Sequence, residues 1–111
     1  MASVQECEAA FARLAERLDK AAESGRAGSL DRTLACTLRD LDVVYAGRIK
    51  DGRLVDIARA KNDRAKVRLT MNSDDLIALV DGTLRLASAW AGGRVKVDAS
   101  IGDMVKLRSI F

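Results

Sequence analysis

The stretch AKVRLTM-NSDD-LIALV, residues 65–80, decides the fold because a strand pattern passes directly into a helix pattern. Val67, Leu69 and Met71 alternate with charged or hydroxyl residues, which predicts a strand with one buried face. Asn72 or Ser73 is placed to cap the following helix, and acidic residues in a first turn suit the positive end of the helix dipole. A helix that leaves a strand this abruptly is expected to fold back over the sheet.

The rest of the C-terminal half repeats this alternation of short elements. Gly82 separates the first helical stretch from a second one that ends in Ala89-Trp90-Ala91-Gly92-Gly93. An alternating strand, residues 94–99, follows, and residues 101–111 form an amphipathic tail. These patterns predict short helices wrapped over one face of a sheet.

The N-terminal half predicts one helix and a meander. Residues 3–23 carry apolar side chains every three or four positions, and Ser3 with Glu6 has the spacing of a capping box. Strand patterns follow at about residues 34–38, 43–49 and 54–60, and Asp51-Gly52 is a strong hairpin signal. Sequential strands joined by tight turns must pair antiparallel.

These elements predict an α/β (α+β) domain spanning residues 1–111. It has a five-stranded, mostly antiparallel sheet, with an N-terminal helix and several C-terminal helices covering one face. The charged alternates of the strands leave the other face to solvent. A chain of 111 residues that is 49% hydrophobic and 32% charged fits one globular domain. No apolar run is long enough to cross a membrane and no signal peptide is visible, so a cytoplasmic location is expected.

Composition argues against several functions. The chain has no histidine, which removes the Ser-His and Cys-His arrangements and the common histidine-bearing zinc sites. Cys7 and Cys36 have no metal-ligand spacing and are expected to be reduced, buried residues, so no metal and no cofactor are predicted. The pair Asp74-Asp75 suits a helix start better than catalysis, because neighbours on a helix splay apart. No enzymatic activity is therefore expected.

Nucleic-acid binding also has little support. Residues 26–72 carry eleven basic and six acidic side chains, a net +5, which could attract an anionic surface. The chain has only four aromatic residues, and we expect only Tyr45 to be exposed on the sheet, too few to stack on bases. Gly92-Gly93 lies between a helix and a strand, the wrong order for a phosphate loop, and reads as a helix stop.

The apolar side chains of the C-terminal half outnumber what one small sheet needs. By default they form a core, but Met104 and the terminal residues add surface that can adapt to irregular shapes. An apolar lining with few polar groups also suits a hydrophobic ligand. Composition does not separate a filled core from a tunnel.

Residues 65–111 resemble the second half of the sterol carrier protein type 2 family of small lipid-binding domains. The similarity lies in the strand, the helix start Ser73-Asp74-Asp75-Leu76, the glycine Gly82, the run from Ala89 to Val97 and the closing apolar helix with Met104 to Leu107. Ala99 stands where the family usually has a glycine. The resemblance implies a five-stranded sheet, an apolar tunnel under its helices, and binding of fatty acids, acyl-CoAs, phospholipids or sterols without catalysis.

The leading hypothesis is thus a non-catalytic carrier of a lipid-like molecule, with no nucleic-acid partner and no integral membrane association. The alternative is an interaction or dimerisation module with a filled core, in which the helix 3–23 stripe or the terminal Ile110 and Phe111 pack on another chain. A homodimer is possible under either. The predicted ligand-binding residues are Val67, Leu69, Met71, Leu76, Leu79, Val80, Leu84, Trp90, Val95, Met104, Leu107 and Phe111.

Overall fold

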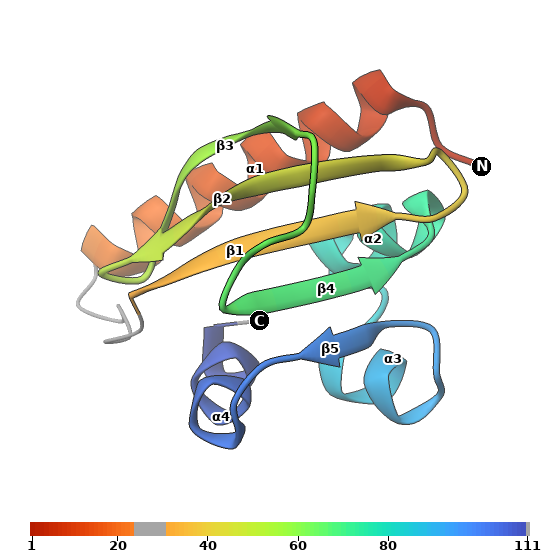
Figure 1. The fold of residues 1–111 in the computed structure, drawn as a ribbon. Coiled ribbons are helices and arrows are strands. Elements are labelled where there is room, and N and C mark those ends of the chain that lie inside the picture. The colour runs from red at the N-terminus through yellow and green to blue at the C-terminus, as the bar shows by residue number, and fades with distance from the viewer. Residues whose placement is uncertain (24–30, 111) are drawn as a thin grey trace.

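The protein is a single layer of sheet with helices packed against it (Figure 1). The computed structural model describes residues 1–23 and 31–110. In chain order the elements are α1 (Val4–Glu23), β1 (Arg32–Leu38), β2 (Val43–Lys50), β3 (Arg53–Ala60), β4 (Val67–Met71), α2 (Ser73–Asp81), α3 (Leu86–Ala91), β5 (Lys96–Asp98) and α4 (Ile101–Ile110). The α+β class predicted from the sequence is confirmed.

The five strands form one mixed sheet in the order β3-β2-β1-β4-β5. The predicted meander is confirmed, since β1 pairs antiparallel with β2 and β2 pairs antiparallel with β3. β4 lies parallel to β1, and β5 pairs antiparallel with β4. At the β2–β3 hairpin, Asp51 and Gly52 both have positive φ, 53° and 76°. A two-residue turn with this geometry matches the twist of the strands, as the Asp-Gly signal predicts.

Helices α1 and α2 lie behind the sheet in Figure 1, while α3 and α4 flank the short edge strand β5. The predicted capping box is present: the Glu6 backbone N–H donates to Ser3 Oγ and the Ser3 N–H donates to Glu6 Oε1, both at 3.1 Å. The buried stripe of α1, which packs on the chain's own sheet, consists of Cys7, Ala10, Phe11, Leu14 and Leu18.

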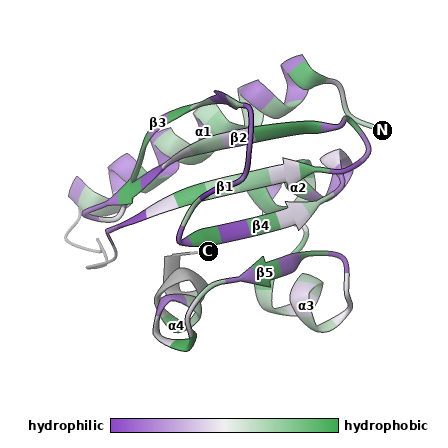
Figure 2. Ribbon diagram, in the orientation of Figure 1, coloured by the Kyte–Doolittle hydropathy of each residue, from purple (hydrophilic) through white to green (hydrophobic). Residues whose placement is uncertain are grey.

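The opposite face of the sheet is less open than the sequence predicts. Because β3 and β4 lie on either side of β2 and β1, the chain between them must cross those strands, and residues 61–66 do so in front of the sheet (Figure 1). This crossing segment is hydrophilic (Figure 2). It is tied to β1 where the Lys66 N–H donates to Thr33 Oγ1 at 2.9 Å, and on this face of β1 Ala35 is completely buried. A fully solvated face was therefore the wrong expectation.

The start of α2 is capped from a distant part of the chain. Asn72 occupies the cap position without making a side-chain cap bond. Asp40, in the turn after β1, instead accepts the Ser73 backbone N–H at 2.8 Å and also the Ser73 hydroxyl. Partial burial by itself raises the pKa of Asp40, but these hydrogen bonds outweigh it and hold the pKa below its ordinary value. The Ala2 N–H donates to Ser73 Oγ at 3.0 Å, which ties the N-terminus to the same point.

The two aspartates of the first turn of α2 point to different partners. Asp74 pairs with the amine of Met1 at 3.1 Å, and Asp75 accepts the Arg94 Nε–H at 2.9 Å. The Asp75 side chain is nearly buried, so its pairing with Arg94 fixes the segment after α3 against α2. The aspartates therefore do not converge on one point, as expected for neighbours on a helix.

A β-bulge interrupts β3. On β2 only Gly47 lies between Ala46 and Arg48, whereas two residues, Asp56 and Ile57, lie between their partners on β3. Asp56 has a φ of 57°, the left-handed conformation found in many bulges. A Cβ at Gly47 would lie 2.9 Å from the Val55 carbonyl oxygen, so glycine permits this close approach. The bulge reverses which face the following residues of β3 occupy.

Candidate functional site

An apolar cavity lies between the sheet and the helices, where the sequence places a ligand. Its wall contains no polar surface and is contributed by α1, β1, β3, β4, α2 and α3. The lining residues are Phe11, Leu14, Leu34, Cys36, Leu54, Leu69, Met71, Leu76, Leu79, Val80 and Leu86.

The volume of this cavity is about 20 Å³. That is room for roughly one water molecule, whereas pockets that bind small molecules usually measure ~300–1,000 Å³. The predicted tunnel is therefore closed in this structure, and a ligand of lipid size requires the wall to move. Leucine dominates the wall, and its methionine, Met71, has a flexible side chain that can repack around irregular shapes.

The alternating strand and the first C-terminal helix both contribute to the cavity wall. Leu69 and Met71 of β4 meet Leu76, Leu79 and Val80 of α2 at the cavity. The reason is the abrupt strand-to-helix turn, which returns the apolar face of α2 onto the apolar face of β4.

The other predicted binding residues lie elsewhere. Val67 and Val95 are buried but do not line the cavity, and Leu84 and Met104 are only partly buried. Trp90 does not line the cavity either, and the residue is 49% exposed. The six-residue helix α3 turns Leu86 and Ala89 inward, and the next position lies about 100° further round the helix. The Leu107 side chain and Phe111 fall outside the part of the chain that the structure describes.

The N-terminal half also contributes to the cavity, which its sequence patterns did not predict. Phe11 and Leu14 come from the α1 stripe, Leu34 and Cys36 from the inward side of β1, and Leu54 from β3. Their periodicity shows that they are buried, but it does not show which surfaces they bury against. Because the α1 stripe covers the chain's own sheet, it is not free to pack on another chain.

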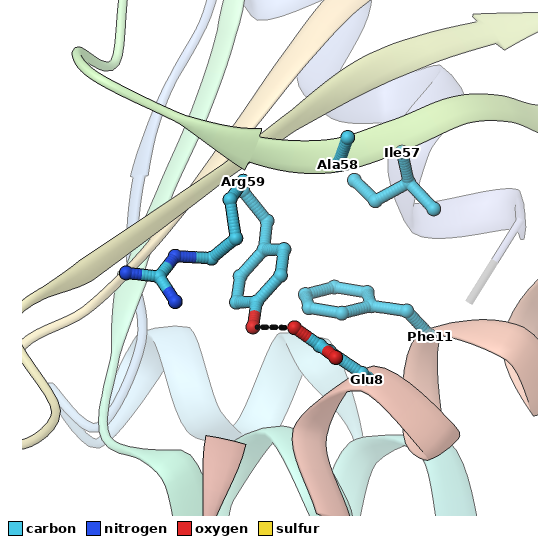
Figure 3. A pocket seen from close by; sticks show the side chains of 6 residues that line it. Glu8, Phe11, Ile57, Ala58 and Arg59 are labelled. Carbon is cyan, nitrogen blue, oxygen red and sulfur yellow. Dashed lines mark hydrogen bonds between the residues drawn. The ribbon is translucent and has the colours of Figure 1, made fainter. Parts of the chain in front are cut away.

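A second pocket opens to solvent between α1 and β3 (Figure 3). Its volume is about 320 Å³, and its lining residues are Glu8, Phe11, Tyr45, Ile57, Ala58 and Arg59. The Phe11 and Tyr45 rings pack with their centroids 5.0 Å apart and their planes at 48°. Arg59 reaches over the other side of the tyrosine, with Cζ 6.0 Å from the ring centroid.

Tyr45 is 2% exposed, so the prediction that its ring lies free on the sheet was wrong. Its hydroxyl donates to Glu8 Oε2 at 2.8 Å, the bond drawn in Figure 3. Burial, together with the hydrogen bond to the Glu8 carboxylate, raises the pKa of Tyr45 to about 12. The phenol therefore stays protonated and acts as a hydrogen-bond donor, not as an acid or base, near neutral pH.

Both thiols are buried and free, as the sequence predicts. Burial raises the pKa of Cys36, in the cavity wall, to about 12. Burial and the nearby carboxylates of Asp40 and Glu6 raise the pKa of Cys7 to about 11. Neither thiol is a nucleophile at neutral pH, since the thiolate is the reactive form.

Within residues 1–23 and 31–110, no group of three or more Cys, Asp or Glu side chains has an arrangement that could hold a metal ion. The same residues contain no helix long and apolar enough to cross a bilayer.

The sequence matches the SCP-2 sterol transfer family over residues 11–111, and the chain belongs to this family. No curated protein sequence matches it. Among solved structures, the chain is similar to the sterol carrier protein 2 like 2 from Aedes aegypti, with 16% identity and a TM-score of 0.71 over 96% of this chain and 97% of that one. The resemblance inferred from residues 65–111 is thereby confirmed.

Two further structures are informative. The A. aegypti sterol carrier protein 2, solved in complex with the C16 fatty acid palmitate, is 22% identical with a TM-score of 0.65, over 97% of this chain and 94% of that one. The inverting sec-alkylsulfatase Pisa1 from Pseudomonas sp. is 25% identical with a TM-score of 0.64. That match covers 88% of this chain but only 15% of the sulfatase, so the similarity concerns one segment of a much longer enzyme.

Proposed function

We propose that this protein binds and carries a lipid-like molecule, with the acyl or hydrocarbon part held between the sheet and helices α1 to α3. The observation that carries the proposal is the wholly apolar cavity at this place, in a chain that belongs to the SCP-2 sterol transfer family. The palmitate complex of a structure with the same fold supports a fatty acid as one ligand.

The energetics favour such a ligand even though the cavity is closed. Each buried methylene contributes ~0.8 kcal/mol, so about ten of them supply roughly 8 kcal/mol. That equals the binding free energy of a dissociation constant of about 1 μM. Opening the wall reduces this figure, and a longer buried chain increases it.

We further propose that the protein performs no reaction on its ligand. Its only thiol in the cavity wall is Cys36, which the raised pKa keeps protonated, and the chain has no histidine to act as a general base. Among the described residues that line the cavity, no other side chain donates or accepts a proton.

Native mass spectrometry of the purified protein with sodium palmitate tests the proposal. A complex of one protein and one palmitate is expected, together with a concentration-dependent rise in unfolding temperature. Failure of palmitate, an acyl-CoA, a phospholipid and a sterol alike to bind would refute it.

Dimerisation and a cytoplasmic location stay predictions. The apolar side chains of Trp90, Ile101 and Val105 are exposed on α3 and α4, and a second copy could pack there. Sedimentation velocity over a range of concentrations decides between monomer and dimer.

A further inference from the structure

The closed cavity and the open pocket meet at one side chain. Phe11 lines both of them, and it is only 4% exposed. On its inner side lies the apolar wall of the cavity, and on its outer side lies the solvent-open pocket between α1 and β3 (Figure 3). A change of the Phe11 rotamer would therefore join a volume of about 320 Å³ to the cavity. The joined space reaches the range of ~300–1,000 Å³ that ligand sites occupy.

The bulge in β3 shapes the outer pocket. Leu54 pairs with Ile49 and Arg59 pairs with Tyr45, and both β2 partners are buried on the helix side of the sheet. Leu54 and Arg59 are five residues apart, so regular alternation would place them on opposite faces. The extra residue of the bulge places them on the same face. Arg59 thus stands at the outer pocket and not on the far face of the sheet.

The other charged side chain at this pocket leaves the Arg59 guanidinium available to bind an anionic ligand. Glu8 accepts the Tyr45 hydroxyl, and in the part of the chain that the structure describes no carboxylate forms an ion pair with Arg59. Glu8 is the acidic group that faces the same pocket, and it lies on α1, across from β3. An anionic head group would therefore bind on the β3 side of the pocket, where the Arg59 guanidinium could donate hydrogen bonds to it.

We propose that the pocket between α1 and β3 is the entrance to the apolar cavity, that Phe11 is its gate, and that Arg59 binds the carboxylate of a single-chain fatty acid. This inference rests on the proposed function, because it specifies how the same ligand enters and is oriented. The acyl chain passes Phe11 into the cavity, and the carboxylate stays at the solvent side.

Blocking the entrance tests the route. Ile57→Trp places a larger side chain in the outer pocket, and Val55→Trp is the matched control because Val55 pairs with Arg48 on the opposite face of the same strand. Stopped-flow fluorescence with cis-parinaric acid, a fluorescent fatty acid, measures entry, and transfer to phospholipid vesicles measures release. Ile57→Trp is expected to slow both by about tenfold, a rise in barrier of ~1.4 kcal/mol. Phe11→Leu is expected to speed both, and circular dichroism checks that each variant is folded.

Removing the charge tests the head-group contact. Arg59→Gln is expected to weaken cis-parinaric acid binding roughly fivefold, since an exposed ion pair contributes up to ~1 kcal/mol. Binding of the neutral methyl ester should not change. Arg64→Gln, which removes the same charge from the exposed crossing segment, is the control and should leave both affinities at the wild-type value.

The outcomes separate this inference from the proposed function. If the wild-type protein binds neither the acid nor the ester, the proposed function fails and the inference fails with it. If it binds both, while Ile57→Trp exchanges ligand as fast as Val55→Trp, the entrance lies elsewhere and only the inference is refuted. If Arg59→Gln and Arg64→Gln change the affinity for cis-parinaric acid equally, the head-group contact is refuted in the same way.

Discussion

Leu69→Ala should destabilise the empty protein much more than the protein that holds a fatty acid. Leu69 is 5% exposed on β4 and lines the cavity. Deleting a buried leucine side chain to alanine costs about 3–5 kcal/mol, of which the residual hole contributes ~24 cal/mol per Å³. A hole of ~100 Å³ therefore accounts for roughly 2 kcal/mol. An acyl chain that enters the cavity fills this hole. Palmitate should therefore raise the free energy of unfolding of Leu69→Ala by roughly 2 kcal/mol more than it raises that of the wild type.

Leu38→Ala is the matched control for this prediction. Leu38 lies on the neighbouring strand β1 and is completely buried, but it does not line the cavity. Leu38→Ala should lower the free energy of unfolding by the same amount with and without palmitate. Urea unfolding followed by circular dichroism, with and without saturating palmitate, gives all the required values. If palmitate reduces the destabilisation caused by Leu69→Ala and that caused by Leu38→Ala equally, or reduces neither, the prediction is refuted. Either result would show that the acyl chain does not occupy the space beside Leu69.

Three further predictions concern the pocket and the buried titratable groups. Gly47→Ala should lower the free energy of unfolding by about 1–3 kcal/mol, because the new Cβ would crowd the backbone of the β3 bulge. Urea titration measures this change, and a neutral effect would contradict the close approach at Gly47. Cys7 and Cys36 should react with a disulfide reagent only after denaturant is added, since burial raises their pKa values to about 11 and about 12, and rapid labelling of the native protein at neutral pH would show otherwise. The free energy of unfolding should fall as pH rises from 10 towards 12, because native Tyr45, with a pKa of about 12, keeps a proton that the unfolded chain loses near 10.0. Tyr45→Phe should make this fall with pH less steep, and an unchanged pH dependence would argue against a buried phenol.

Local patterns predicted the part of the fold that depends on neighbouring residues. The Ser3–Glu6 capping box and the Asp51-Gly52 hairpin are set by a few adjacent side chains, and both are present in the structure. The alternation of residues 65–71 likewise predicted that Leu69 and Met71 share the face of the strand that the helices cover, and both line the cavity. In each case the physical cause lies within a few residues of the pattern.

The remaining features depend on contacts between distant segments. Asp40 caps α2 from the turn after β1, which no short window of sequence reveals. The β3 bulge places two residues of that strand opposite Gly47 of β2, and the shift in alternation puts Arg59 on the same face as Leu54. The exposure of Trp90 could not be predicted for a different reason, since a helix of six residues has too few positions to define its buried face from periodicity.

Isotope-filtered nuclear Overhauser spectroscopy with ¹³C-labelled palmitate shows directly whether the acyl chain enters the cavity, because it reports which methyl groups lie within a few ångströms of the chain. We expect contacts from the chain methylenes to the methyl groups of four residues in the wall of the closed cavity, Leu14, Leu69, Met71 and Leu79. Contacts confined to exposed groups such as Val105, with none to these four, would show that the interior stays closed to lipids and would contradict it.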